Sequence, residues 1–283
     1  MNLLARRCRS SLTVAVLIAA CLTAPSQVAA ADANKVLRYA WRIAESTFDP
    51  VVASDLYSHT ALEGMLDPML AYDYLAQPPK LIPNTLREMP EVGEGGTLFT
   101  FRLRSGIHFI PDPAFKGKQR ELIAQDYAYS LRRFFDPKLK SPWLFLFDGK
   151  IVGANAVMDQ ATKTGVFDYD APIEGLSVTD RYTLRLKLTG PDYNLLWILA
   201  ASMTSAVARE VVEFYGTDVG AHPVGTGPFM LKEWRRSSRM VLEANPGFRD
   251  MPYDASPAVD DAEGQAFLAK SKGKKLPLVG RVE

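Results

Sequence analysis

Cysteine and histidine are scarce in this chain. Only two cysteines and three histidines occur among its 283 residues. His59, His108 and His222 lie far apart, and none has a second metal-binding side chain at the spacing that a zinc site uses. Both cysteines, Cys8 and Cys21, lie near the amino terminus. The sequence therefore predicts no metal site and no cofactor, and it predicts no disulfide in the body of the protein.

Familiar catalytic motifs are missing as well. The sequence contains neither the G-x-S-x-G elbow of esterases nor a G-x-x-x-x-G-K-[ST] phosphate loop, and we predict no catalytic residues. Lys and Arg number 33 against 32 Asp and Glu, a net charge of +1, which excludes a broad basic surface for nucleic acid. Gly225-Thr226-Gly227 could hold an anion with its amides, but a tight turn explains the two glycines equally well.

The first 31 residues have the pattern of an export signal. Arg6, Arg7 and Arg9 precede an apolar run over residues 12–22, which is shorter than the ~20 residues that span a bilayer. Small residues at Ala29-Ala30-Ala31 then offer a cleavage site. We predict a signal peptide over residues 1–31. An alternative is that Ile18-Ala19-Ala20-Cys21 is a lipoprotein box in which Cys21 is lipidated.

What the chain does have is an ordinary globular composition, with 47% hydrophobic and 23% charged residues. Alternating and β-branched patterns predict strands, and apolar spacings of three and four residues predict helices. Strands are expected at 36–43, 97–104, 182–188 and 276–283, with a hairpin over 229–243. Helices are expected at 54–66, 124–135, 151–165, 192–201 and 208–215, with an exposed connection at 254–275. These elements predict a mixed α and β fold, since so many hairpin-like pairs do not suit a purely parallel sheet.

Several short segments, taken in order, resemble one known family. They include Phe48-Asp49-Pro50, residues 97–109, residues 126–133, Asn245-Pro246-Gly247-Phe248 and Pro223-Val224-Gly225-Thr226-Gly227-Pro228-Phe229. The chain from Val36 to Phe248 resembles the family 5 bacterial extracellular solute-binding proteins, the peptide-, dipeptide- and nickel-binding components of ABC importers.

The resemblance implies an α/β fold of the periplasmic-binding-protein type, in which two lobes close on a ligand. Because family members are considerably longer, we expect the first lobe only, with the second lobe missing. In that lobe we predict a β-rich subdomain from residues 32–58 and 174–283, whose tail at 249–283 leads toward the second lobe. An α+β subdomain is expected to be inserted at 59–173.

The resemblance also implies a ligand-binding segment at Ile43, Ala44, Glu45, Ser46 and Thr47. In relatives, exposed main chain there pairs with the ligand as an added strand, which gives affinity without side-chain choice. Glu45 could in addition meet a ligand cation, or it could be a solvated carboxylate at a strand end.

Trp143 lies in the aromatic run Ser141-Pro142-Trp143-Leu144-Phe145-Leu146-Phe147. It is a further candidate for ligand binding, as part of a pocket wall, with a buried core segment as the alternative. A longer loop at 110–121 departs from the family pattern, so the substrate class does not transfer directly.

These features predict a periplasmic, monomeric solute-binding subunit of an ABC importer. It would capture small peptides and deliver them to permease subunits in the inner membrane, without enzymatic activity. Nickel, haem, opines and sugars stay open as ligands. A secreted hydrolase of unassigned type is the alternative from another class, and a structural envelope protein is a third. A single lobe is expected to bind ligand very weakly or not at all.

Overall fold

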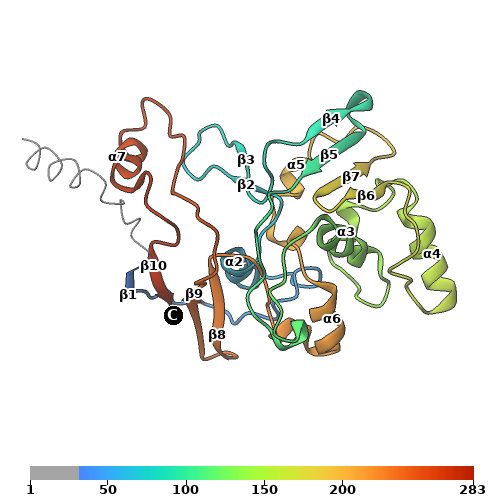
Figure 1. Cartoon of the computed structure of the whole chain (residues 1–283), viewed down its shortest axis with the longest axis horizontal. Coiled ribbons are helices and arrows are strands. Elements are labelled where there is room, and N and C mark those ends of the chain that lie inside the picture. The colour runs from blue at the N-terminus through green and yellow to red at the C-terminus, as the bar shows by residue number, and fades with distance from the viewer. Residues whose placement is uncertain (1–31) are drawn as a thin grey trace, which may run out of the picture.

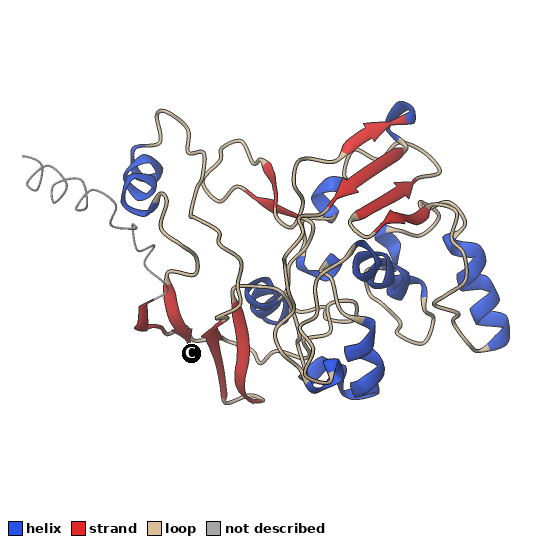
Figure 2. Cartoon of the chain, in the orientation of Figure 1, coloured by secondary structure: helices blue, strands red, loops and turns tan. Residues whose placement is uncertain are grey.

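A computed structural model describes residues 32–283 of the chain. The predicted signal peptide, and the alternative of lipidation at Cys21, lie outside the described residues. Figure 1 shows the arrangement of the elements, and Figure 2 separates helices from strands. The fold mixes helices with three sheets, as the sequence predicts.

The helices and strands alternate irregularly along the chain. The helices are α2 (Leu56–Met65), α3 (Ala124–Arg132), α4 (Ala154–Thr164), α5 (Leu195–Ile198), α6 (Arg209–Tyr215) and α7 (Ala262–Ser271). The strands are β1 (Asp32–Leu37), β2 (Leu70–Tyr72), β3 (Leu81–Pro83), β4 (Glu91–Gly93), β5 (Leu98–Arg102), β6 (Leu176–Asp180), β7 (Thr183–Lys187), β8 (Phe229–Arg235), β9 (Arg239–Ala244) and β10 (Val279–Val282).

One four-stranded sheet has the strand order β1-β10-β9-β8 and joins the two ends of the described chain. β1 runs parallel to β10, and the other neighbours are antiparallel. Helix α2 packs on β8, and its buried residues Leu62 and Met65 share a hydrophobic cluster with Leu242 of β9. This sheet and α2 frame the groove described below.

The second four-stranded sheet, in the order β4-β5-β7-β6, is entirely antiparallel and lies away from the first (Figure 1). Phe99 and Phe101 of β5 are buried on one face, as their alternation with polar residues predicts. Helix α3 covers this sheet by packing against β6 and β7. The predicted subdomain boundary between residues 173 and 174 cuts through the sheet, because β7 on one side of it pairs with β5 on the other.

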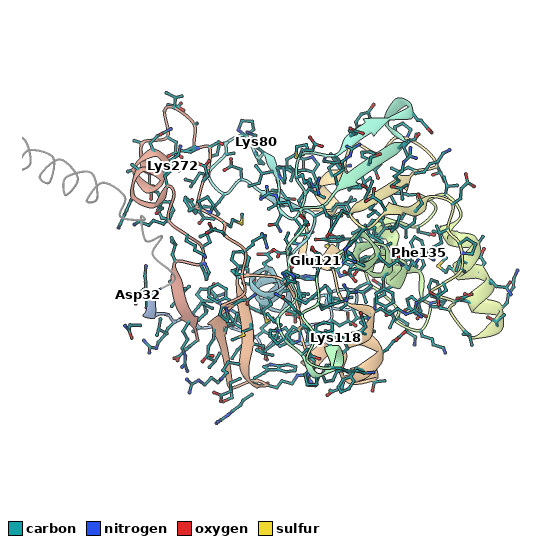
Figure 3. The ribbon with its side chains drawn as sticks, viewed as in Figure 1. Asp32, Lys80, Lys118, Glu121, Phe135 and Lys272 are labelled. Atoms are coloured by element: carbon teal, nitrogen blue, oxygen red, sulfur yellow. The ribbon has the colours of Figure 1, made fainter. Side chains whose placement is uncertain are left out.

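A large hydrophobic core lies beneath the second sheet and around α3. Phe135, just after α3, is fully buried there, whereas Lys80 and Lys272 project from the rim of the molecule (Figure 3).

The glycine-rich loop at 223–228 precedes strand β8 and packs against the end of helix α2. A side chain at Gly225 or Gly227 would overlap the main chain of Met65, so only glycine fits there. The Gly227 N–H donates to the Met65 carbonyl at 3.0 Å. The structure gives a reason for the two glycines that differs from both sequence interpretations: neither has a positive φ, and both are required because the loop packs closely on the main chain of Met65.

The buried carboxylate of Asp67 holds this loop in place through hydrogen bonds. Its carboxylate accepts hydrogen bonds from the Thr226 hydroxyl at 2.7 Å, the Asn84 amide at 3.0 Å and the Arg249 guanidinium at 2.6 Å. Burial alone would raise the pKa of Asp67, but the charge of Arg249 and these hydrogen bonds outweigh it, and the pKa is lowered. One carboxylate thus holds three segments that are distant in sequence.

Two expected elements differ from the structure. The strand expected at 36–43 begins at Asp32 and ends at Leu37; beyond it the Tyr39 N–H still donates to the Glu283 carbonyl at 2.9 Å, but residues 40–43 have no main-chain partner within residues 32–283. The exposed connection expected at 254–275 contains α7, whose first turn is capped by the side chain of Asp261 accepting from the Gly264 N–H. Local composition did not reveal this helix.

Candidate functional site: a groove along residues 39–45

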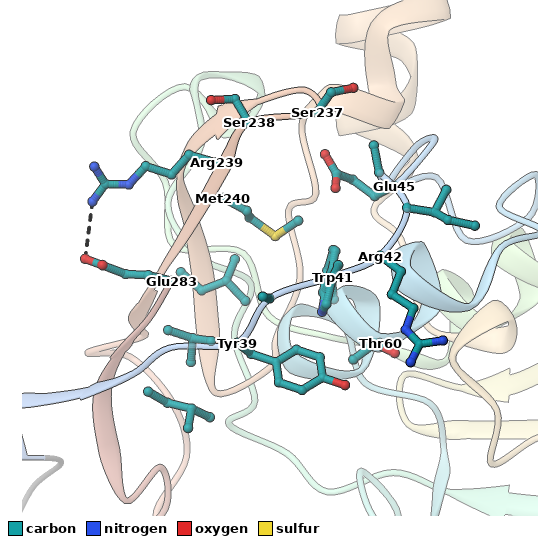
Figure 4. A pocket seen from close by; sticks show the side chains of 17 residues that line it. Tyr39, Trp41, Arg42, Glu45, Thr60, Ser237, Ser238, Arg239, Met240 and Glu283 are labelled. Carbon is teal, nitrogen blue, oxygen red and sulfur yellow. Dashed lines mark hydrogen bonds and ion pairs between the residues drawn. The ribbon is translucent and has the colours of Figure 1, made fainter.

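The chain leaves the first sheet after β1 and forms one wall of an open groove of about 750 Å³ (Figure 4). The opposite wall is the β8–β9 turn and the start of β9, and α2 contributes Thr60 and Ala61. The lining residues on the first wall are Leu37, Tyr39, Ala40, Trp41, Arg42, Ile43, Ala44 and Glu45. Those facing them include Ser237, Ser238, Arg239, Met240, Leu242, Val282 and Glu283.

The main chain of residues 40–45 is the most distinctive feature of this groove. Within residues 32–283, its N–H and C=O groups make no hydrogen bond. Pairing resumes immediately on either side: the Tyr39 N–H donates to the Glu283 carbonyl at 2.9 Å, and the Ser46 N–H donates to the Ser58 hydroxyl at 3.0 Å. Main-chain groups of a folded protein are normally paired, so residues 40–45 call for a partner outside the described residues.

A buried ion pair fixes the chain just beyond the groove. The Arg133 guanidinium donates two hydrogen bonds of 2.7 Å to the Asp49 carboxylate, and both side chains are almost fully enclosed. The Phe48 N–H donates to the Gly220 carbonyl at 2.8 Å. The motif Phe48-Asp49-Pro50 therefore acts as an anchor for the segment that precedes it.

Glu45 is enclosed at the end of the groove, with 7% of its surface exposed. The Trp234 indole N–H donates to its Oε1, and the Trp234 ring packs on Phe48 with centroids 4.7 Å apart. The solvated alternative for Glu45 is therefore wrong, because the carboxylate is buried and held by an indole.

Ser46 and Thr47 lie outside the groove lining and form a polar network at the start of α2. The Ser46 hydroxyl donates to Asp55 at 2.6 Å, and the Ser58 hydroxyl does the same at 2.6 Å. Burial would raise the pKa of Asp55, but these hydrogen bonds outweigh it and lower the pKa to about 2. The network holds the end of the groove segment against α2.

Trp143 lies apart from the groove. Its indole N–H donates to the Ala53 carbonyl at 2.6 Å, and its ring meets His59 edge-on at 5.4 Å. Of the predicted site residues, Ile43, Ala44 and Glu45 line the groove, whereas Ser46, Thr47 and Trp143 do not. Their roles in ligand binding stay predictions.

The groove also contains residues that sequence reasoning missed as site residues. Tyr39, Trp41 and Arg42 precede the predicted segment, and Met240 comes from the far side. The only signal in the sequence was the pair of aromatic residues in an expected strand. The contribution of the β8–β9 turn depends on folding and had no local signal.

A serine and a histidine lie within hydrogen-bond reach elsewhere in the fold, which bears on the hydrolase alternative. The Ser202 hydroxyl lies 3.0 Å from Nδ1 of His59, and Nε2 of His59 lies 3.1 Å from the Ala53 carbonyl. Ser202 is 4% exposed and does not line the groove. The partner of Nε2 is a main-chain carbonyl rather than the carboxylate of a catalytic triad. The pair therefore serves packing between α2 and the 202–204 turn.

No set of three or more His, Cys, Asp or Glu side chains in residues 32–283 is arranged to hold a metal ion. In the same part of the chain, every helix is too short or too polar to cross a bilayer.

The arrangement of helices and sheets matches part of the periplasmic-binding-protein fold. OppA of Listeria monocytogenes, solved with bound peptide, superposes with a TM-score of 0.64 over 88% of this chain and 42% of that chain, at 19% identity. An oligopeptide-binding protein of Borrelia burgdorferi gives 0.65 over 84% and 45%, at 20% identity. The predicted fold class is confirmed.

Sequence comparison then defines the family. The model of the bacterial extracellular solute-binding proteins, family 5, middle region, matches residues 68–274. The chain belongs to this family, as its motifs predicted. The peptide transport periplasmic protein SapA of Salmonella typhimurium is 29% identical over 86% of this chain. Di/tripeptide-binding protein 2 of Pseudomonas aeruginosa is 27% identical over 80%. The chain spans 43% and 40% of the lengths of these two relatives.

Proposed function

We propose that this chain is the solute-binding subunit of an ABC importer, which captures peptides in the periplasm and delivers them to a membrane permease. The names of SapA and of the di/tripeptide-binding protein support peptides as the ligand class. The observation that carries the proposal is the main chain of residues 40–45 along the groove, which has no hydrogen-bond partner within residues 32–283. A peptide brings a matching row of N–H and C=O groups, which nickel, haem, opines and sugars do not.

In this mechanism the peptide adds a strand beside residues 40–45. Trp41 and Met240 offer apolar surface to its side chains, while main-chain hydrogen bonds hold its backbone whatever those side chains are. About three such bonds, at ~0.5–1.5 kcal/mol each, amount to roughly 2–4 kcal/mol. That corresponds to millimolar or weaker binding at this wall alone.

The proposed cycle is one of capture and release. It forms and breaks no covalent bond, so it requires no cofactor and no catalytic residue, and the bound peptide leaves unchanged. The subunit acts as a monomer that docks on its permease.

The four tryptophans of the chain provide an internal test of where peptides bind. Trp41 lines the groove and Trp234 contacts Glu45, whereas Trp143 packs against His59 and Trp197 packs against Tyr72. We expect millimolar trialanine to shift the indole N–H signals of Trp41 and Trp234 in ¹⁵N-edited NMR spectra. The signal of Trp197 serves as a matched control in the same sample.

Two results would count against the proposal. One is the absence of any indole shift at saturating peptide, or a shift confined to Trp197. The other is cleavage of the peptide, seen by mass spectrometry of the recovered ligand, which would favour a hydrolase instead.

A further inference from the structure

Charged side chains are few along the groove, and only some of them are already paired. The charged residues that line it are Arg42, Glu45, Arg239 and Glu283. Arg239 and Glu283 pair with each other at 3.3 Å, and Glu283 also meets Arg38. Arg42 and Glu45 make no ion pair within residues 32–283.

The two unpaired charges differ in their surroundings. The guanidinium of Arg42 is exposed to solvent and lies near Thr60, whereas the carboxylate of Glu45 lies at the other end, toward Ser237 and Met240 (Figure 4). An exposed guanidinium is fully hydrated and needs no partner. Glu45 as a residue is only 7% exposed, and its carboxylate faces the groove, where Oε1 accepts from the Trp234 indole and Oε2 has no hydrogen-bond partner within residues 32–283.

The setting of Glu45 is therefore that of a preformed subsite for a positive group. Trp234 holds one carboxylate oxygen, and the packing of Trp234 on Phe48 fixes the position of the indole. Trp41 and Met240 line the groove beside it with an aromatic ring and a soft thioether, surfaces that suit the aliphatic stem and head of a cation.

We propose that Glu45 is a specificity-determining residue, which selects peptides that present an ammonium group to this end of the groove. Trp234 acts as the positioning residue for the carboxylate. This inference rests on the proposed function, because it assumes that a peptide backbone lies along residues 40–45. The ammonium group can come from a lysine side chain or from a free amino terminus, and the test separates the two.

Three matched peptides distinguish these sources. Acetyl-Ala-norleucine-Ala-amide carries no ammonium group, acetyl-Ala-Lys-Ala-amide carries one on its side chain, and Ala-norleucine-Ala-amide carries one at its amino terminus. Titration followed by the Trp41 indole signal should show that one of the charged peptides binds about 10-fold more tightly than the neutral one, the size expected for a charge-assisted hydrogen bond.

Glu45→Gln keeps an oxygen that accepts from Trp234 but removes the charge, so it should bring the ratio of charged-peptide to neutral-peptide affinity down to about 1, whatever its effect on the neutral peptide. Arg42→Gln is the control that alters the other unpaired charge and should not weaken the preference. Trp234→Phe should reduce the preference with little effect on the neutral peptide. In the unsubstituted protein, the ¹³Cδ signal of Glu45 should shift with the preferred charged peptide only.

The outcomes separate this inference from the function on which it rests. Equal binding of the three peptides, or a preference that survives Glu45→Gln, would overturn the role of Glu45 and leave peptide capture standing. Failure of all three to shift the Trp41 signal would overturn peptide capture itself.

Discussion

Replacing Asp49 by asparagine should be among the most damaging single changes in this protein. The Asp49 and Arg133 side chains are 6% and 2% exposed and share two hydrogen bonds of 2.7 Å. The substitution keeps the size and shape of the side chain but leaves the Arg133 guanidinium buried without its counter-charge. Breaking a buried pair in this way costs about 3–5 kcal/mol.

The loss of unfolding free energy should be measurable by urea unfolding followed by circular dichroism, and it should also lower the melting temperature. For a domain of this size, 3–5 kcal/mol corresponds to a fall in Tm of roughly 6–20 °C. Glu91→Gln is a matched control, since Glu91 and Arg102 also lie 2.7 Å apart but their side chains are 64% and 36% exposed. An exposed pair contributes only about 0–1 kcal/mol, so this variant should unfold almost as the parent does.

The pair also predicts strong non-additivity. Because Asp49→Leu combined with Arg133→Met removes both charges, the double variant should be less destabilised than the sum of the two single changes by several kcal/mol. Equal costs for Asp49→Asn and Glu91→Gln, or additive costs in the cycle, would refute the reasoning that burial makes this pair critical.

Three further predictions concern packing and pH. Gly225→Ala should cost about 1–3 kcal/mol in a urea unfolding assay because its methyl group meets the Met65 main chain, whereas Gly190→Ala, in open space, should be nearly neutral; equal effects would contradict the close-packing role of the loop. The lowered pKa of Asp55, about 2, means that its contribution is complete above the unfolded value near 3.9 and is lost as the pH falls toward about 2. Asp55→Asn should make the stability depend less on pH between about 4 and 2, and an unchanged acid unfolding curve would count against this role of Asp55. Burial lowers the pKa of His59 below 6.5, so the stabilisation from neutral His59 is complete above about pH 6.5 and declines as the pH falls; His59→Gln should weaken that dependence, and an NMR titration midpoint at or above 6.5 would contradict it.

The elements that the sequence predicted well are those whose local pattern matches their final environment. β5 alternates Phe99 and Phe101 with polar residues, and its buried face in the sheet follows that alternation. The family motifs also predicted the fold correctly, because residues such as Gly225 are constrained by close packing that no other side chain permits.

The parts that could not be predicted depend on partners distant in the chain. Residues 40–43 have strand-like composition, yet they form no strand because their main-chain groups have no partner within residues 32–283. The same holds for the site: Ile43, Ala44 and Glu45 were identified through the family resemblance, but the opposite wall around Met240 was not. Burial of Glu45 under Trp234 depends on a contact across 189 positions, which no local pattern encodes.

Hydrogen exchange at the amides of residues 40–45 tests the central claim most directly. In the free protein these amides make no hydrogen bond within the described chain, so they should exchange rapidly. Saturating trialanine should slow exchange at alternate amides of this segment, because strand addition pairs every second residue on the side facing the ligand. Peptide binding that leaves exchange at residues 40–45 unchanged, with protection arising elsewhere, would contradict the account.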